Sequence, residues 1–207
     1  MAEIEYFYAA HSAYAYLGSR RLMEIAAAAG RSIAHKPYDL RAGIVGVGSK
    51  TIGERTEGHL EYFFGREVER WSEYRNAPVK KRLPTHHHKS ITPSNTMLIA
   101  GLVKGLNIDA LAHAMLEQHW RDDADLADND TLAAIARSVG IDPAPLFEIS
   151  GSKEVLDIYD ANTREAIERS VFGSPTYVVD GDMFYGQDRL EMVERALKLP
   201  FTTRLPA

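Results

Sequence analysis

A serine hydroxyl at the start of the first expected helix is the first group in this sequence that could take part in chemistry. Ser12 follows a strand-like segment, Ile4 to Tyr8, and precedes a helical pattern that runs to about Ala29. Unpaired N–H groups at a helix N-terminus favour an anion, and they can lower the pKa of a thiol from about 8.5 into or below the neutral range. The chain contains no cysteine, so a thiolate beside Ser12 would have to belong to a ligand. The alternative is that Ser12 only caps the helix.

A second candidate is the backbone around Ser174-Pro175, directly before the strand-like segment Thr176 to Val179. Proline cannot donate a hydrogen bond to a sheet, and an X-Pro bond adopts the cis form at a cost of only about 0.5–1 kcal/mol. A cis Pro175 would expose the N–H and C=O of Ser174, which could then pair with an extended, peptide-like ligand. The alternative is an ordinary proline at the edge of a sheet.

Gln187 and Asp188 follow Gly186 at the start of the last expected helix, residues 187–198. The backbone N–H groups there favour a carboxylate, and Asp188 could accept a hydrogen bond from an ammonium, so the pair could bind an amino-acid head. The alternative is that both residues only cap the helix. A hydroxyl for a thiolate, a slot for a peptide backbone and a site for an amino-acid head are together what glutathione requires, and we expect it as the cofactor.

Histidine and aromatic residues add further candidates. His11, beside Ser12, could act as a general base or fix the loop conformation, and we favour the structural role. The run His86 to His88 suggests a metal, but three consecutive imidazoles do not easily converge on one ion. We expect no metal there and favour a polar loop that could line the cleft. We expect Tyr14, Tyr16 and Trp71 to wall an apolar substrate pocket, and His113 and His119 to be surface or packing residues.

The elements that must position these groups occur in the order strand, helix, strand, then a long helical block, then strand, strand, helix. The strands at 4–8 and 33–38 flank the first helix and should be parallel. Asp180-Gly181 suits the tight turn of a hairpin formed by 176–179 and 183–185. This order predicts an α/β protein with a thioredoxin-like fold and a large all-helical insertion between its β-α-β and β-β-α halves. The expected domains are a thioredoxin-like domain, residues 1–40 and 170–207, and a helical insertion domain, residues 41–169.

The spacing of apolar residues and the positions of candidate cap, glycine and proline residues predict the helices of the insertion. Ser94, Asp109 and Asp130 are candidate N-caps, and the glycine-rich run 43–53 is expected to be a mobile connector. The expected helices span 59–75 and about 94–104, 109–121, 131–139, 143–149 and 152–169.

Composition and net charge limit the classes of partner that the protein could bind. The 207 residues carry a net charge of −5, with no basic block beyond Lys80-Lys81-Arg82, which argues against nucleic acid. No stretch approaches the roughly 20 apolar residues that span a bilayer, and the acidic start of the chain lacks a signal-peptide core. We therefore expect a cytoplasmic protein with no membrane partner.

Three segments resemble the family of 2-hydroxychromene-2-carboxylate isomerases and kappa-class glutathione transferases, a branch of the DsbA-like thioredoxin superfamily. VFGSPTYVVDGDMFYGQDRLEMVERAL, from residue 171, resembles the C-terminal signature of the isomerase subgroup. YFYAAHSAYAYLG is similar to the first strand and serine-bearing loop, and TPSNTMLIAGL, with Asn95, resembles a helix start in the insertion. The resemblance implies a glutathione-dependent enzyme, usually a homodimer, with a catalytic serine and no metal.

By this resemblance Ser12 is the catalytic residue, Ser174 before cis Pro175 pairs with the tripeptide backbone, and Gln187 and Asp188 hold the γ-glutamyl head. The sequence also departs from the family. Ala13 stands where proline commonly follows the serine. Leu60 and Phe63 stand where lysine and tyrosine are expected, and Lys50 is the candidate for the glycyl carboxylate instead.

The function expected from these residues is that of a glutathione-dependent isomerase. In it a thiolate adds reversibly to a small aromatic or conjugated carbonyl substrate, a bond rotates, and elimination returns the cofactor. One alternative is a kappa-like glutathione transferase that conjugates hydrophobic electrophiles. Another is a non-catalytic protein of the same fold that binds glutathione or extended peptides.

Overall fold

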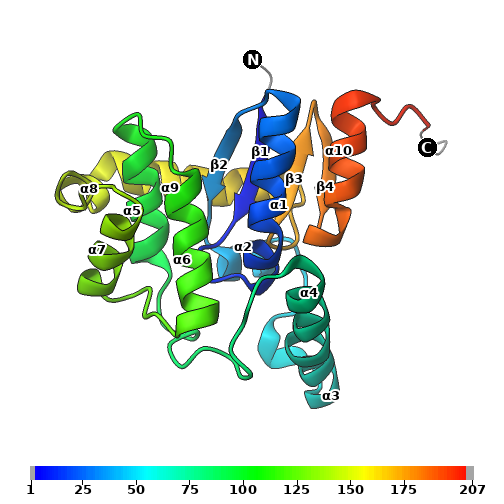
Figure 1. The fold of residues 1–207 in the computed structure, drawn as a ribbon, viewed down its shortest axis with the longest axis horizontal. Helices are drawn as coiled ribbons and strands as arrows, with labels where there is room; N and C mark the ends of the chain where they lie inside the picture. Colours follow the sequence, from blue (N-terminus) through cyan, green and yellow to red (C-terminus); the bar gives the residue numbers. More distant parts are fainter. Residues whose placement is uncertain (1–2, 204–207) are drawn as a thin grey trace.

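A four-stranded mixed sheet forms the centre of the molecule, which is described by a computed structural model over residues 3–203. The strand order is β2-β1-β3-β4, with β1 (Ile4–Tyr8) parallel to β2 (Ile33–Pro37). β3 (Thr176–Val179) pairs antiparallel with β1 and forms a hairpin with β4 (Asp182–Tyr185), as Figure 1 shows. Asp180 and Gly181 have φ angles of 48° and 88°, which is the geometry of a primed hairpin turn. The predicted thioredoxin-like fold class is confirmed.

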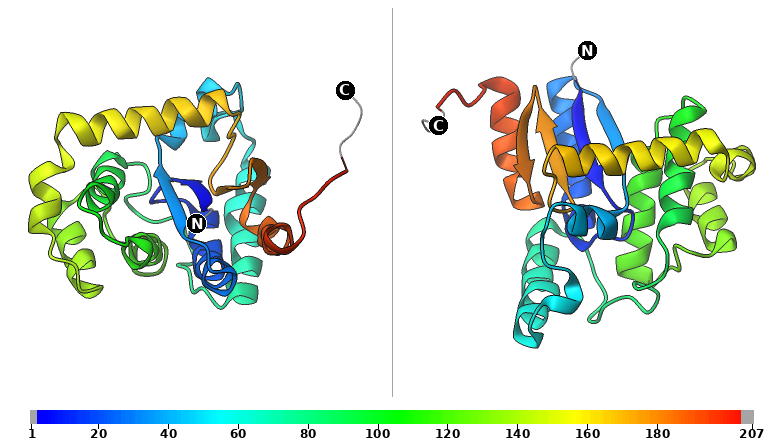
Figure 2. Two further views of the ribbon diagram at one scale, coloured as in Figure 1. Left: turned by 90° about the horizontal axis from the view of Figure 1, so that it is seen from above. Right: turned by 180° about the vertical axis from the view of Figure 1, so that it is seen from behind.

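Helices cover both faces of this sheet. α1 (Ala13–Ala29) and α10 (Leu190–Lys198) lie side by side on one face, and α9 (Lys153–Glu168) crosses the other face (Figures 1 and 2). The last helical segment consists of η3 (Gln187–Arg189) followed by α10. Gly18 permits α1 to approach the start of this segment closely, since a Cβ at Gly18 would lie 2.7 Å from the Gln187 Cβ. The layers therefore bring the beginning of α1 close to the segment that follows β4.

A row of tyrosine rings packs between the sheet and its helices. Tyr6 stacks on Tyr8 with ring centroids 4.1 Å apart and on Tyr177 of the neighbouring strand at 5.5 Å. All three side chains are buried, and burial raises the pKa of each hydroxyl. These rings make a rigid base for the loop that follows β1.

All regular secondary structure between β2 and β3 is helical. Thr51 caps η1 (Ile52–Glu54). The π-helical stretch η2 (Glu61–Arg66) is continuous with α3 (Glu57–Leu60) before it and α4 (Glu67–Arg75) after it. None of the helices within residues 3–203 is long and apolar enough to cross a membrane. The elements are α2 (Leu40–Gly46), η1 (Ile52–Glu54), α3 (Glu57–Leu60), η2 (Glu61–Arg66), α4 (Glu67–Arg75), α5 (Thr92–Val103), α6 (Asp109–Asp122), α7 (Asn129–Ser138) and α8 (Ala144–Ser150).

Some sequence predictions for this part are wrong. The expected connector 43–53 begins inside α2, which is capped by Asp39. Ser94 lies within α5, where its hydroxyl donates to the Ile91 carbonyl, and is not an N-cap. Asp109 is the first residue of α6 and Asp130 lies inside α7, whose cap is Asp128 because its carboxylate accepts from the Thr131 N–H.

Candidate functional site

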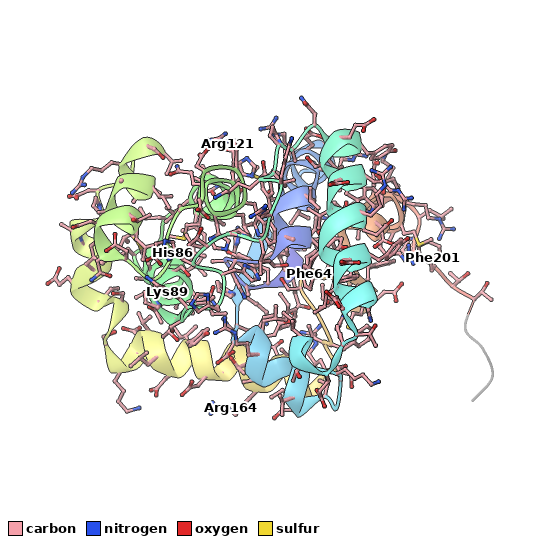
Figure 3. All side chains as sticks on the ribbon, turned by 90° about the horizontal axis from the view of Figure 1, so that it is seen from below. Phe64, His86, Lys89, Arg121, Arg164 and Phe201 are labelled. Atoms are coloured by element: carbon pink, nitrogen blue, oxygen red, sulfur yellow. The ribbon has the colours of Figure 1, made fainter. Side chains whose placement is uncertain are left out.

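A cavity of about 390 Å³ opens where the loop after β1 meets the loop before β3. Its walls come from the first turn of α1, the segment from α2 to α4, the residues around the β3–β4 hairpin, and His87. Seen from below in Figure 3, the loop with His86 and Lys89 and the helical segment with Phe64 lie on either side of α1. Residues distant in sequence therefore face one space, of a size that suits a small-molecule ligand.

Ser12 and Ser174 meet at the floor of this cavity. The Ser12 hydroxyl donates to the Ser174 carbonyl oxygen at 3.0 Å, and its oxygen accepts from the Ala15 N–H at 3.3 Å. The Ser174 hydroxyl in turn accepts from the Ala9 N–H at 3.2 Å. The Ser174-Pro175 bond is cis, as expected, but Pro175 itself does not line the cavity. The structure thus places the two predicted serines in direct contact.

Three of the residues that line the cavity, Ala13, Tyr14 and Ser174, have free backbone donors. Ala13 and Tyr14 are the first two residues of α1, so their N–H groups have no partner within the helix. The Ser174 N–H also lacks an acceptor within residues 3–203. Together with the helix dipole these donors favour an anion beside Ser12.

Gln187 lies in the cavity wall, at the first position of η3 (Gln187–Arg189). The side chain is buried, and its Oε1 accepts from the Arg75 Nε at 3.2 Å. The Gln187 Nε2 is buried without a partner in the described part of the chain. Asp188 is exposed and forms an ion pair with Arg189 at 2.7 Å. Both predicted residues line the cavity, but the free donor is the Gln187 amide and the Asp188 carboxylate is already paired.

Arg75 of α4 holds this corner together. Besides Gln187 it pairs with Glu191 at 2.9 Å, and its guanidinium lies over the Trp71 and Tyr74 rings, 5.4 Å from each ring centroid. The contacts of Arg75 with Gln187 and Glu191 fix α4 against the start of the last helical segment. Sequence reasoning missed Arg75, although the arginine and its two aromatic neighbours lie on one short helix.

Lys50 is exposed and does not reach the cavity, so the structure does not support it as the cation of the site. Two arginines line the cavity, and Arg189 is paired with Asp188. The other is Arg55, which lies over the Phe63 ring at 5.1 Å and contacts the His59 Nε2 at 3.2 Å. Its Nε is buried without a partner, and it forms no ion pair with any carboxylate of residues 3–203. Arg55 is therefore an uncompensated positive charge facing the cavity.

The expected aromatic walls are partly confirmed. Tyr14 and Trp71 line the cavity, and the Tyr14 hydroxyl donates to the Phe63 carbonyl at 2.6 Å. Burial raises the pKa of Tyr14, so its hydroxyl stays protonated. Tyr16 points elsewhere, with its hydroxyl on the Pro78 carbonyl at 2.9 Å.

Three histidines lie in contact beside the cavity. The His11 and His87 rings are 4.7 Å apart, and His87 and His119 form a hydrogen bond at 3.0 Å. Desolvation, with the neighbouring imidazoles, lowers the pKa of His11 and His87, and desolvation lowers that of His119. His119 is buried packing, as predicted, and His11 and His87 line the cavity. No group of three or more histidines and carboxylates in residues 3–203 is arranged to hold a metal ion.

Asn95 connects the serine-bearing loop to the insertion. Its Oδ1 accepts from the Ala10 N–H at 3.1 Å, and its Nδ2 donates to the Tyr38 carbonyl at 3.0 Å and to the Tyr159 hydroxyl at 3.4 Å. The side chain is completely buried. Asn95 thus positions Ser12 indirectly, by fixing the backbone two residues before it.

Comparison with known proteins agrees with this geometry. The family model of the DSBA-like thioredoxin domain matches residues 3–198. The sequence is 26% identical over 195 residues to the 2-hydroxychromene-2-carboxylate isomerase of Sphingobium xenophagum, covering 94% of this chain and 97% of that protein. It is 25% identical over 197 residues to the isomerase of Pseudomonas putida, covering 94% and 93%. This homology supports an isomerase.

Solved structures show the same fold. A 2-hydroxychromene-2-carboxylate isomerase superposes with a TM-score of 0.77 at 23% identity, covering 94% of each chain. The cytosolic disulfide reductase DsbM of Pseudomonas aeruginosa superposes with a TM-score of 0.65 at 16% identity, covering 96% of this chain and 93% of DsbM. With a match over nearly its whole length, the chain belongs to the DSBA-like thioredoxin domain family.

Proposed function

We propose that this protein is a glutathione-dependent isomerase of a small aromatic or conjugated carbonyl substrate. The observation that carries the proposal is the meeting of the Ser12 hydroxyl, the free N–H groups of α1 and the Ser174 backbone at one cavity, in a chain without cysteine. The curated relatives are isomerases, and the fold neighbour DsbM has been solved with GSH.

The start of α1 supports the binding of a thiolate. The N–H groups of Ala13 and Tyr14 and the hydroxyl of Ser12 supply donors at the positive end of a helix of 17 residues. Such an end favours the ionised form of a sulfur ligand. Bound glutathione would supply the nucleophile, which adds to the conjugated carbonyl substrate and leaves again after a bond has rotated, so that no cofactor is consumed.

Ser12 and Ser174 are suited to change partners together. The Ser12 hydroxyl has one hydrogen, which the Ser174 carbonyl now accepts. Ser12 can therefore donate to a ligand only by leaving that carbonyl, which becomes free to accept a hydrogen bond from a peptide N–H. The Ser174 N–H can donate to a peptide carbonyl at the same time, as in strand addition.

The polar groups without partners fit the two ends of glutathione. The Gln187 Nε2 can donate to the carboxylate of the γ-glutamyl head, and the Arg55 guanidinium can pair with the carboxylate at the other end. A buried donor without a partner destabilises a protein by about 1–3 kcal/mol, so two such groups in one wall favour a ligand with complementary acceptors. The rings of Tyr14, Phe63 and Trp71 leave an apolar surface for an aromatic substrate.

The test is an assay with 2-hydroxychromene-2-carboxylate, the compound named for the relatives, with and without glutathione. We expect turnover only with glutathione, and an unchanged concentration of free thiol after many turnovers. Loss of thiol in step with product would make the protein a transferase instead. Calorimetric binding of glutathione with no turnover would make it a non-catalytic binder, and binding of extended peptides alone would remove glutathione from the proposal.

A further inference from the structure

The hydrogen bonds of His119 and His87 determine where each imidazole carries its proton. The His119 Nδ1 lies 2.8 Å from the Ala124 carbonyl oxygen, which can only accept, so this nitrogen carries a hydrogen. In a neutral ring the His119 Nε2 is then an acceptor. It lies 3.0 Å from the His87 Nδ1, which must donate to it.

The remaining nitrogen of His87 therefore has a free lone pair. In the neutral ring Nε2 carries no hydrogen, and it has no hydrogen-bond partner within residues 3–203. This nitrogen is not completely enclosed by the described part of the protein, and His87 lines the cavity. His87 consequently presents an acceptor to a bound molecule.

The surroundings keep His87 neutral. Desolvation, the adjacent His119, the Arg41 guanidinium and His88 lower the pKa of His87 to about 3. Arg41 comes close because its Nη2 donates to the His87 carbonyl at 3.2 Å. A neutral ring with this tautomer cannot donate from Nε2, so a carboxylate or phenolate is disfavoured there and an uncharged donor is favoured.

We infer that His87 is a specificity-determining residue whose Nε2 accepts a hydrogen bond from an uncharged hydroxyl group on an aromatic substrate, with His119 as the positioning residue that fixes its tautomer. This inference rests on the proposed function for the role of the cavity as the substrate site. It assigns the uncharged hydroxyl group of the substrate to His87 and places no ionised group of the substrate against that ring.

A matched pair of simple probes tests the assignment without glutathione. Titration of the wild-type protein with 3-hydroxybenzoate and 3-methoxybenzoate, followed by NMR of ¹⁵N-labelled histidine side chains, gives both dissociation constants and the state of each ring nitrogen. We expect the hydroxy compound to bind about tenfold more tightly, which is the effect of one hydrogen bond. We also expect the free protein to show an unprotonated His87 Nε2.

Three variants complete the test. His87→Phe should bind the two probes equally, and the exposed neighbour His88→Phe should keep the wild-type ratio. His119→Phe should leave His87 with mixed tautomers and a smaller ratio. Equal binding of both probes by the wild-type protein, a protonated Nε2 in its spectrum, or an unchanged ratio in His87→Phe would overturn the inference. The wild-type spectrum tests the tautomer of His87 without any variant. None of these measurements uses glutathione, so they can succeed or fail independently of the turnover assay that tests the proposed function.

Discussion

The Ser12 hydroxyl donates to the Ser174 carbonyl oxygen, 3.0 Å away, across 162 residues of sequence. The Ser12 hydroxyl oxygen accepts from the Ala15 N–H, so one hydroxyl caps α1 and closes the contact between the two loops. Because that contact uses the only hydrogen of the hydroxyl, Ser12 can donate to a ligand only by giving up the Ser174 carbonyl.

Ser12→Ala should reduce turnover with glutathione about 100-fold, since it removes one donor from an anion that develops in a buried site. The lost cap should lower the free energy of unfolding by about 1 kcal/mol. Steady-state kinetics and urea unfolding measure the two effects. Ser19→Ala, on the same helix and outside the cavity, is the control, and an unchanged rate in Ser12→Ala would remove Ser12 from the catalytic role.

Arg55→Met should weaken the binding of glutathione about ten- to hundredfold, because a charge-assisted hydrogen bond is lost while the stem of the side chain keeps its packing. Calorimetry measures the change. Lys50→Met is the matched control, since Lys50 is exposed and away from the cavity, and it should bind as the wild type does. The reverse order of effects would restore Lys50 as the carboxylate ligand.

Gly18→Ala should destabilise the fold by about 1–3 kcal/mol through overpacking. The new Cβ would lie 2.7 Å from the Gln187 Cβ and 2.9 Å from the Tyr177 hydroxyl, so the start of the last helical segment must shift. Gly58→Ala, in α3, meets nothing within 4 Å and should be neutral or stabilising by up to about 1 kcal/mol. Thermal unfolding compares the two, and equal effects would contradict the close packing at Gly18.

Asn95→Asp should lower the free energy of unfolding by about 3 kcal/mol. The carboxylate can still accept from the Ala10 N–H, but it faces the Tyr38 carbonyl without a hydrogen to donate and is fully buried. Asn129→Asp, exposed at the start of α7, should stay within about 0.5 kcal/mol of wild type. Urea denaturation measures both, and similar stabilities would show that Asn95 does not tie the loop.

Stability should fall as the pH drops below about 6.5, before the carboxylates titrate. Desolvation lowers the pKa of His11, His87, His113 and His119 below 6.5, so the unfolded chain binds more protons than the folded one in this range. Each imidazole contributes up to about 1.4 kcal/mol per pH unit.

Urea denaturation between about pH 7 and pH 5 measures this slope. His87→Phe removes one of the four groups and should flatten the dependence, whereas His88→Gln, at an exposed position, should leave it unchanged. A pH-independent free energy of unfolding in the wild type would contradict the burial of neutral imidazoles.

The sheet could be predicted from local signals. β1, the helix after Ser12 and the Asp180-Gly181 hairpin all depend on residues adjacent in sequence, and they were found within one or two residues. The helix α2 was missed because its glycines suggested a mobile segment. In the structure they allow close packing, since a Cβ at Gly43 would lie 2.7 Å from the Tyr38 ring and one at Gly46 2.5 Å from the Ile167 Cδ1.

The site could be predicted only in part. Ser12 and Ser174 follow from their places beside regular elements, and the structure brings them together. Arg55 and Arg75 come from the insertion, where helical periodicity shows which face is buried but not which distant residue it meets, and neither was predicted. Lys50 was predicted as the ligand of the glycyl carboxylate, but it is exposed and away from the cavity. The glutathione cofactor, the homodimer, the cytoplasmic location and the division into two domains remain predictions.

The three contacts of Asn95 also have a consequence for protein engineering. A single amide side chain from the insertion sets the path of the loop before Ser12, and its partners come from three separate stretches of chain. Replacing the helical block between the two halves of this scaffold with a foreign one would therefore also change what holds the loop before Ser12. Donor sequences with an amide at the equivalent place should preserve the path of that loop.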